Sequence, residues 1–288
     1  MTLGLYLLIG LFAAAPDTTV PGVPVEAALR IIHPMVNQGN LGRNAILLAL
    51  VNRSRAEAGL KPLQWDNRLA EAAHEHAQLM SAKGELSHQF PGEPDLANRL
   101  VPKLRLDQAG ENVFYDASLQ SAHEAFMKSP NHRANLLNPA YDSIGIGIVD
   151  VAGVLFIVED FAHRVPELSN EDAAGRVAQQ FARLRQAAGT GELRFQHDAQ
   201  LQNLACSMAD RDTVDSKAGT SLPGVRVAAF YATTDPSQLP ANVARLSALN
   251  GVGSIGVGVC YARTPKYPTG LYWVSFMLFQ GSTTIASK

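Results

Sequence analysis

Two histidines and one glutamate stand where the chain is expected to change direction. His88 comes shortly after a helix-ending glycine, Glu111 opens an apolar run, and His132 lies two residues after Pro130. Proline has no N–H to donate and disfavours helical geometry in the residue before it, so a helix ends there and His132 can face a cleft. Two imidazoles and a carboxylate suit a divalent metal or acid–base chemistry. As residue types alone, they would equally serve to bond backbone at the ends of elements.

The other histidines in the sequence carry less information. His74 and His76 are two residues apart, about 200° around a helix, whereas the metalloprotease pattern needs histidines four apart on one helix face. We therefore expect both to be solvated helix residues. His33, His123 and His163 stand alone, and we assign them no role.

Capping residues and apolar stripes predict the helices that position these side chains. Asn44 is expected to cap a first helix that ends at Gly59. Asp66 is expected to cap a second helix, whose apolar residues recur every three to four positions until Gly84. A third helix is predicted over residues 118–129, and a short helix follows it.

Two apolar segments, residues 143–149 and 155–161, are predicted to form paired strands. In the first segment isoleucines alternate with Gly145 and Gly147. Glycines on one face of a strand let a helix backbone approach closely. We therefore expect close helix packing on this face of the sheet.

The second half of the chain repeats the framework of the first half. Matching segments occur in the same order at both ends of the unit. The polar residues do not repeat, because Arg226-Val227-Ala228 stands where Gly110-Glu111-Asn112 should recur. We interpret the second half as a copy that has lost the site. The matches are 53–59 with 183–189, Leu63 and Trp65 with Leu193 and Phe195, Asp66 and Leu69 with Asp198 and Leu201, 143–148 with 254–259, and 155–158 with 271–274.

Composition limits the classes of protein that the chain can represent. Its 288 residues favour two domains, and 47% hydrophobic with 17% charged residues is typical of a globular protein rather than a disordered one. A net charge of -2 gives no electrostatic case for nucleic-acid binding. Two cysteines, Cys206 and Cys260, are too few for a disulfide-built scaffold.

The N-terminus has the pattern of an export signal. Residues 3–15 are nearly all apolar and end in three alanines, so we predict a signal peptide over residues 1–15 and a secreted or periplasmic protein. The run is shorter than the roughly 20 residues that a membrane-spanning helix needs. A buried N-terminal helix is the alternative. Residues 16–42, rich in proline and glycine, are predicted to form a tether.

Several motifs taken together resemble a bacterial member of the CAP superfamily, the SCP-like family of cysteine-rich secretory proteins, antigen 5 and plant pathogenesis-related proteins. The resemblance covers about residues 44–161 and implies an α+β fold, an α-β-α sandwich with a central antiparallel sheet, in an extracellular setting. It implies a CAP domain over residues 43–165, followed by a degenerate CAP-like domain over residues 166–288. The motifs are residues 53–59, 63–66, 87–88, 110–113, 129–137 and 144–147.

The resemblance also implies a ligand-binding cleft. The family's cleft commonly holds two histidines and two glutamates, and His88, Glu111 and His132 correspond to three of them by motif. The fourth position, a glutamate in many relatives, is Ser129 here. The three matching residues are the candidate ligands of a divalent cation such as Zn, Mg or Ca. One carboxylate fewer predicts weaker binding of that cation.

The sequence leaves the function open between classes, and no catalytic residue is assigned. The first hypothesis is an extracellular binding or interaction module whose cleft engages a small ligand, a lipid, an extracellular protein or a divalent metal. The alternative is a weak metal-assisted hydrolase, with His88 and His132 as ligands and Glu111 as ligand or general base. A third interpretation is that these residues only hold the cleft walls together. Nucleic-acid partners and a membrane span in the mature chain are not expected.

A disulfide between Cys206 and Cys260 is a separate prediction, and the family resemblance does not decide whether it forms. Within the repeat, Cys206 corresponds to a residue of the second helix and Cys260 to a residue of a central strand. Helix and strand pack together in this fold, although the adjacency of these two positions does not follow. An exported protein would keep such a bond.

Overall fold

The chain divides into two compact units between Arg164 and Val165, each with its own sheet and core. The computed structural model describes residues 38–196, 198–215 and 222–281. The predicted signal peptide, and the predicted tether up to residue 37, lie outside the described residues. No helix in the described ranges is long and apolar enough to cross a membrane.

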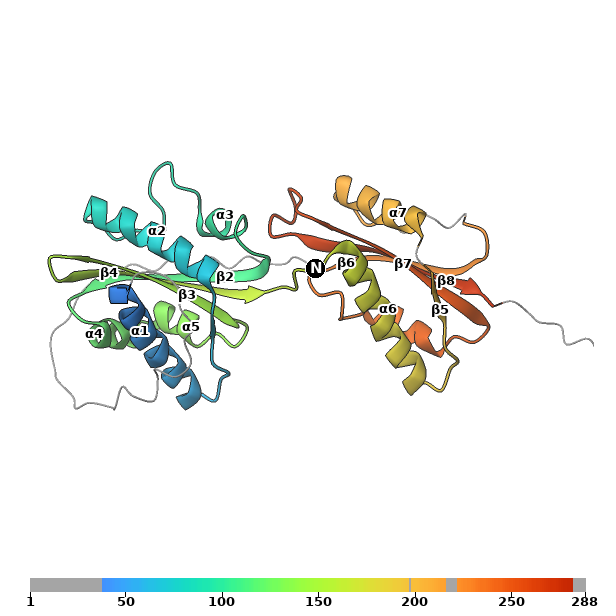
Figure 1. Ribbon diagram of the computed structural model, residues 1–288, viewed down its shortest axis with the longest axis horizontal. Helices are drawn as coiled ribbons and strands as arrows, with labels where there is room; N and C mark the ends of the chain where they lie inside the picture. The colour runs from blue at the N-terminus through green and yellow to red at the C-terminus, as the bar shows by residue number, and fades with distance from the viewer. Residues whose placement is uncertain (1–37, 197, 216–221, 282–288) are drawn as a thin grey trace, which may run out of the picture. The chain divides into compact units, whose positions relative to one another are not determined.

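The first unit is an α-β-α sandwich, which confirms the predicted fold (Figure 1). Its strands lie in the order β1-β3-β4-β2. The three long strands pair antiparallel, as expected, whereas the two-residue β1 pairs parallel with β3. The elements are α1 (Gln38–Glu57), β1 (Gln64–Trp65), α2 (Asn67–Lys83), α3 (Leu96–Leu100), β2 (Leu106–Asp116), α4 (Leu119–Lys128), α5 (Pro130–Leu136), β3 (Ser143–Val151) and β4 (Val154–Arg164).

Most of the predicted helix boundaries are confirmed by the capping contacts. The Asp66 carboxylate accepts backbone N–H groups at the start of α2, and Gly84 ends that helix in the left-handed conformation with φ 65°. The start of α1 was wrongly predicted, because this helix begins at Gln38 and takes in residues 38–42 of the predicted tether. Gly42 is exposed and does not stop the helix, since a glycine in an exposed helix costs only about 1 kcal/mol.

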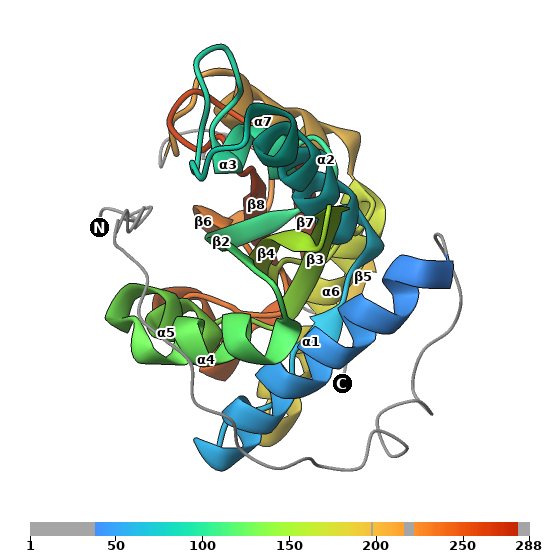
Figure 2. The ribbon, with the colours of Figure 1, turned by 90° about the vertical axis from the view of Figure 1, so that its left-hand side faces the viewer.

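Helices cover both faces of the first sheet and leave β2 at its edge. Helices α2 and α3 lie on one face, and α1, α4 and α5 lie on the other (Figures 1 and 2). On β3 the isoleucines enter the core with α1 and α4. An added Cβ would lie 2.0 Å from Ala70 N at Gly145, and 2.2 Å from Ala73 C at Gly147. The predicted close approach of a helix to these glycines is confirmed.

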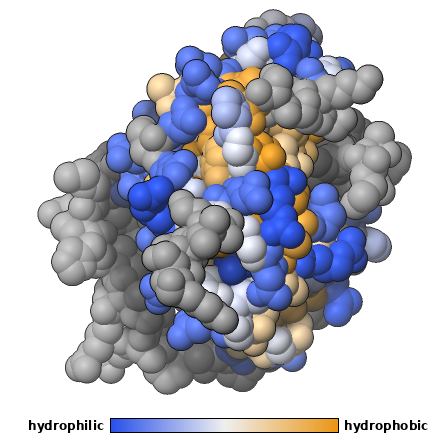
Figure 3. Space-filling model, turned by 90° about the vertical axis from the view of Figure 1, so that its right-hand side faces the viewer, coloured by the Kyte–Doolittle hydropathy of each residue, from blue (hydrophilic) through white to orange (hydrophobic). Residues whose placement is uncertain are grey.

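The second unit has the same strand order and pairing directions, β5-β7-β8-β6. Figure 3 faces this unit and shows a hydrophobic band bordered by hydrophilic side chains. Phe195 and Val214 are among the large apolar residues exposed in this unit. The elements are α6 (Asn170–Ala187), β5 (Arg194–Gln196), α7 (Ala199–Asp210), β6 (Val225–Thr233), α8 (Ala241–Arg245), the 3-10 helix η2 (Leu246–Ala248), β7 (Val252–Ala262) and β8 (Leu271–Gln280).

A buried arginine joins the first helix of each unit to the end of a distant short helix. Arg55 Nη1 donates to the carbonyls of Leu136 and Asn138 at 2.8 and 2.9 Å. Arg185 Nη1 donates to the carbonyls of Ser247 and Leu249 at 3.1 and 2.9 Å. The two arginines match in the sequence repeat, so the two units share these buried hydrogen bonds as well as their sequence pattern.

Strand pairing corrects one of the sequence matches by a single residue. The matched glycines Gly145 and Gly256 pair with Asp160 and Met277, respectively. Residues 154–157 therefore correspond to 271–274, rather than residues 155–158. The reason for the slip is that β4 and β8 are buried on both faces, so their apolar runs have no alternation that fixes the register.

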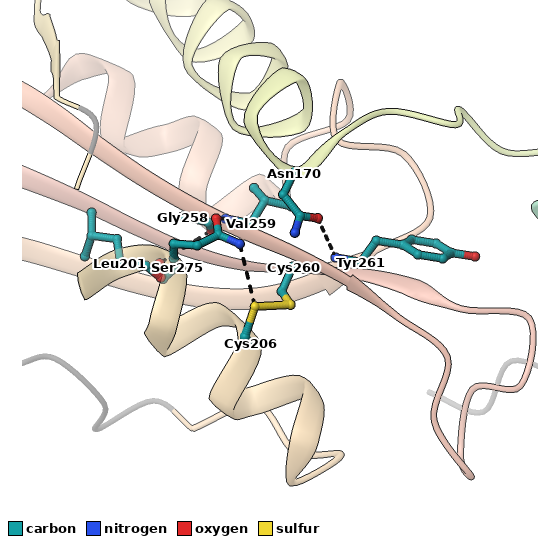
Figure 4. The surroundings of a disulfide bond; sticks show 9 residues. Asn170, Leu201, Cys206, Gly258, Val259, Cys260, Tyr261 and Ser275 are labelled. Atoms are coloured by element: carbon teal, nitrogen blue, oxygen red, sulfur yellow. Dashed lines mark hydrogen bonds between the residues drawn. A yellow bond between two sulfur atoms is a disulfide. The ribbon is translucent and has the colours of Figure 1, made fainter. Parts of the chain in front are cut away.

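The predicted disulfide between Cys206 and Cys260 is confirmed. It joins α7 to β7 with a Cα–Cα distance of 5.0 Å (Figure 4). Nearby, the Ser275 hydroxyl of β8 donates to the Leu201 carbonyl of α7 at 2.7 Å. The helix is thus fixed to its sheet by a covalent bond and by a buried hydrogen bond.

Candidate functional site

The predicted site lies along the edge strand β2, at its Gly-Glu-Asn sequence. A Cβ on Gly110 would come within 2.4 Å of the Tyr141 hydroxyl and 2.9 Å of the Asn135 side chain, so a larger residue would displace both side chains. Adjacent residues of a strand point to opposite faces, so Glu111 and Asn112 extend to opposite sides of the sheet. The motif therefore allows a close approach and aims two polar side chains in opposite directions.

Glu111 is a buried carboxylate that accepts two strong hydrogen bonds. His88 Nδ1 donates to its Oε1 at 2.8 Å, and Arg99 Nη2 donates to its Oε2 at 2.5 Å. Burial alone would raise the pKa of Glu111, but the His88 hydrogen bond and the Arg99 charge outweigh it, and the pKa is lowered. Because an ionised carboxylate only accepts, Nδ1 carries the proton of His88, and Nε2 is the acceptor when the ring is neutral.

His76 is buried, so the expectation that it is a solvated helix residue is wrong. Its Nδ1 lies 2.6 Å from Glu93 Oε1, and its Nε2 lies 2.8 Å from the Ser87 carbonyl. Both partners are acceptors, so both ring nitrogens donate. Glu93 also accepts the backbone N–H of Phe90 at 2.9 Å. These contacts hold the loop after α2 against the helix and fix the backbone next to His88.

On the opposite face of the sheet, Asn112 connects to the helix that carries His132. Asn112 Nδ2 donates to the His132 carbonyl at 3.2 Å and to Glu159 Oε2 at 3.1 Å. The His132 ring packs edge-on against Phe126 with centroids 5.1 Å apart. Burial, and then the nearby charge of His88, lower the pKa of His132. Both effects favour the neutral form of the His132 ring.

Two carboxyl groups of β4 lie fully buried beneath the site. Burial raises the pKa of Glu159 to about 8, although its hydrogen bond with Asn112 acts in the other direction. Burial, and then the charge of Glu111, raise the pKa of Asp160 well above its usual range. Asp160 lies directly across from Glu111 in the sheet. These shifts favour the protonated, uncharged form of both groups.

The structure brings the predicted cleft residues together to different degrees. His88 and Glu111 are in direct contact, whereas the ring of His132 packs against Phe126 and its carbonyl accepts from Asn112. Ser129 stands at the start of α5, three residues before His132, and its side chain makes no capping hydrogen bond. Of the histidines without an assigned role, His163 Nδ1 pairs with Asp107 Oδ1 at 2.6 Å at a partly exposed position.

Sequence reasoning missed five residues of the site, which are His76, Glu93, Arg99, Glu159 and Asp160. One signal was available, because two adjacent carboxylic acids inside an otherwise apolar strand are unusual. The other three residues gave no comparable signal, since their role depends on a loop folding back on α2.

The predicted metal ligands do not fit a site of three protein ligands in this arrangement. Both oxygens of Glu111 already accept hydrogen bonds, and one of the donors is the Arg99 guanidinium. Within the described ranges, no group of three or more His, Cys, Asp or Glu side chains is arranged to hold a metal ion. Metal binding through His88, Glu111 and His132 stays a prediction.

Comparison with known proteins shows which family the first unit resembles. Residues 48–161 match the model of the cysteine-rich secretory protein family, CAP. The uncharacterized protein YkwD of Bacillus subtilis is 34% identical over 146 residues, which are 49% of this chain and 56% of that protein. The uncharacterized membrane protein YlbC of the same organism is 35% identical over 104 residues, 35% of this chain and 30% of that protein.

One of the similar solved structures is an extracellular protein containing a SCP domain from Bacillus anthracis. It is 26% identical with a TM-score of 0.41, and the match covers 46% of this chain and 45% of that one. The chain thus spans about half of the length of the first curated relative and under a third of the second. Residues 48–161 of the first unit are thus similar to the CAP domain, and the curated relatives that match this chain are bacterial.

Proposed function

We propose that the chain is an exported binding protein whose first unit takes a small ligand between His88 and His132. The main support for this proposal is that His88 is partly exposed whereas its partner Glu111 is buried. The His88 side chain is 27% exposed, whereas its partner Glu111 is 2% exposed. Because Nδ1 of His88 is held by Glu111, a neutral His88 presents Nε2 as a lone pair, and the neutral His132 ring lies nearby. The site therefore suits a ligand that offers a hydrogen-bond donor or a cation.

Export is the second part of this proposal. Disulfide bonds persist in oxidising compartments, and both cysteines of the chain are joined in one. The apolar N-terminal run with its three alanines agrees with this compartment. Cleavage after residue 15 would be checked by N-terminal sequencing of the exported protein. An exported protein that begins at Met1 would contradict the signal peptide.

The binding role is tested with Zn²⁺ as the probe, by calorimetric titration of the full chain. His88→Ala and His132→Ala should each weaken zinc binding by about tenfold or more, because each removes one of two imidazole ligands. His163→Ala is the matched control, since it removes a histidine that also pairs with a carboxylate, away from the site. Equal zinc binding by all of these variants, or no binding by the wild type, would contradict the role of this histidine pair.

The alternative function, a metal-assisted hydrolase, has one observation in its favour. A histidine whose Nδ1 is held by a carboxylate has the arrangement of a positioned general base. The engagement of Glu111 by Arg99 weighs against a direct metal role for that carboxylate. A hydrolytic activity that is lost on chelation and in His88→Ala would favour the hydrolase over the binding protein.

A further inference from the structure

Arg99 of α3 is the cation closest to the carboxylate that was expected to bind a metal. Its Nη2 donates to Glu111 Oε2 at 2.5 Å and to the His88 carbonyl at 3.3 Å. Its Nη1 donates to Glu93 Oε1 at 3.4 Å. The side chain of Arg99 is 9% exposed. This guanidinium is therefore an internal part of the site rather than a surface charge.

We propose that Arg99 is the resident cation of this site and that it excludes a divalent metal ion from Glu111. The inference concerns the same site as the proposed function and rests on it only for the role of the two histidines. A divalent cation and a guanidinium compete for the same carboxylate oxygens, because the negative charge of the carboxylate attracts both of them. Arg99 thus determines that ligands are held by the histidines and not by the carboxylate.

Two features of the geometry indicate that Arg99 keeps a metal ion away from Glu111, rather than only forming a structural ion pair with it. The guanidinium binds the Oε2 oxygen of Glu111, while His88 Nδ1 binds the other oxygen, so neither oxygen remains unpaired. The side chains of Arg99 and Glu111 are also largely buried, at 9% and 2% exposure, so the charge of Arg99 is poorly screened and a second cation would be repelled at short range. A purely structural ion pair would predict that loss of Arg99 leaves zinc affinity unchanged or lowers it.

The test compares zinc binding by the full-length wild type with that of Arg99→Gln, measured by calorimetry. Arg99→Gln should bind Zn²⁺ about tenfold or more tightly than the wild type, because the ion can then occupy the place of the guanidinium beside Oε2 of Glu111. The double variant Arg99→Gln with Glu111→Gln should lose that gain. Arg43→Gln is the control for the loss of one positive charge, since Arg43 forms a partly exposed ion pair with Asp150 in the same unit.

The outcomes separate this inference from the proposed function. A folded Arg99→Gln variant with unchanged or weaker zinc binding, or an equal gain in the double variant, overturns the role of Arg99. If Arg99→Gln does not fold, zinc is added while near-ultraviolet circular dichroism is recorded. Recovery of the folded signal supports the inference, and no recovery overturns it. The proposed function fails separately, if His88→Ala and His132→Ala bind zinc like the wild type.

Discussion

In the first unit Glu111 of β2 lies across from Asp160 of β4. In the second unit the same two positions hold Ala228 and Met277, so the sequence match of Glu111 with Val227 was wrong by one residue. The next pair along the strands changes in the same way. Asn112 with Glu159 in the first unit becomes Ala229 with Phe276 in the second unit. Polar residues at the edge of one sheet are thus replaced by apolar ones at the edge of the other.

The residues that the two units share are those that hold the framework. Arg55 and Arg185 make equivalent bonds to backbone carbonyls. Asp66 and Asp198 both cap a helix. These contacts stabilise the fold without regard to any ligand, whereas burying carboxylic acids opposes folding. The difference indicates that the polar cluster of the first unit is kept for a role other than stability.

The largest expected effect is confined to the second unit. Replacing Cys206 and Cys260 by alanine should lower its free energy of unfolding by about 4 kcal/mol, because a cross-link that spans 54 residues restricts the unfolded chain. Each unit contains one of the two tryptophans, Trp65 and Trp273. Urea unfolding followed by Trp273 fluorescence in a Trp65→Phe background gives the measurement. A loss of similar size in the first unit would show that the two units do not unfold independently.

A smaller effect, of opposite sign, is expected from Glu159→Gln in the first unit. The folded-state pKa of Glu159 is raised to about 8, so its contribution to stability is complete below about pH 4.5 and is lost as the pH rises toward 8. At about 1.4 kcal/mol per pH unit, the glutamine variant should be more stable than the wild type by about 3 kcal/mol at pH 7.

The pH series separates this effect from a general change in packing. Glu159→Gln and the wild type should be equally stable near pH 4 and should diverge up to pH 8. Unfolding would be followed by Trp65 fluorescence in a Trp273→Phe background. Glu57→Gln, which changes an exposed carboxylate of the same unit, is the control. A constant difference between Glu159→Gln and the wild type across the series would rule out titration of Glu159 as the cause.

The smallest expected effect is on ligand affinity, through the loop that carries His88. His76→Leu removes both hydrogen bonds that hold this loop and should weaken zinc binding by roughly tenfold, as loss of an orienting contact does in metal sites. His163→Leu is the matched control, because its histidine–carboxylate distance is also 2.6 Å. Unchanged zinc binding in a folded His76→Leu variant would mean that the loop is positioned by Glu93 and Arg99 alone.

Local chemistry explains which parts of the fold were predictable from the sequence. Asp66, Gly84 and Pro130 mark helix ends through contacts with residues only a few positions away, and the predicted ends agree with the structure. Alternation of isoleucine and glycine predicted the two faces of β3 for the same reason. Asn44 was a weaker signal for the start of a helix, because the residues before Asn44 can be helical as well as those after it. The helix accordingly begins at Gln38.

The site was only partly predictable, since its remaining residues depend on distant contacts. The burial of His76 requires the segment that contains Ser87 and Glu93 to fold back on α2, and no local pattern encodes that. Arg99 reaches Glu111 only because α3 lies on the same face of the sheet as α2. Family motifs identified His88, Glu111 and His132, but motifs do not show which charges surround them.

The buried arginines also determine when each unit can close during synthesis. The carbonyl of Leu136 follows Arg55 by 81 residues, and that of Ser247 follows Arg185 by 62 residues. At a ribosomal rate of about 5–20 residues per second, α1 waits roughly 4–16 s for its partner and α6 roughly 3–12 s. Until these carbonyls are synthesised, neither arginine can form the hydrogen bonds that it makes in the folded unit. The first helix of each unit is therefore synthesised early, but its arginine can form these bonds only after most of that unit has been synthesised.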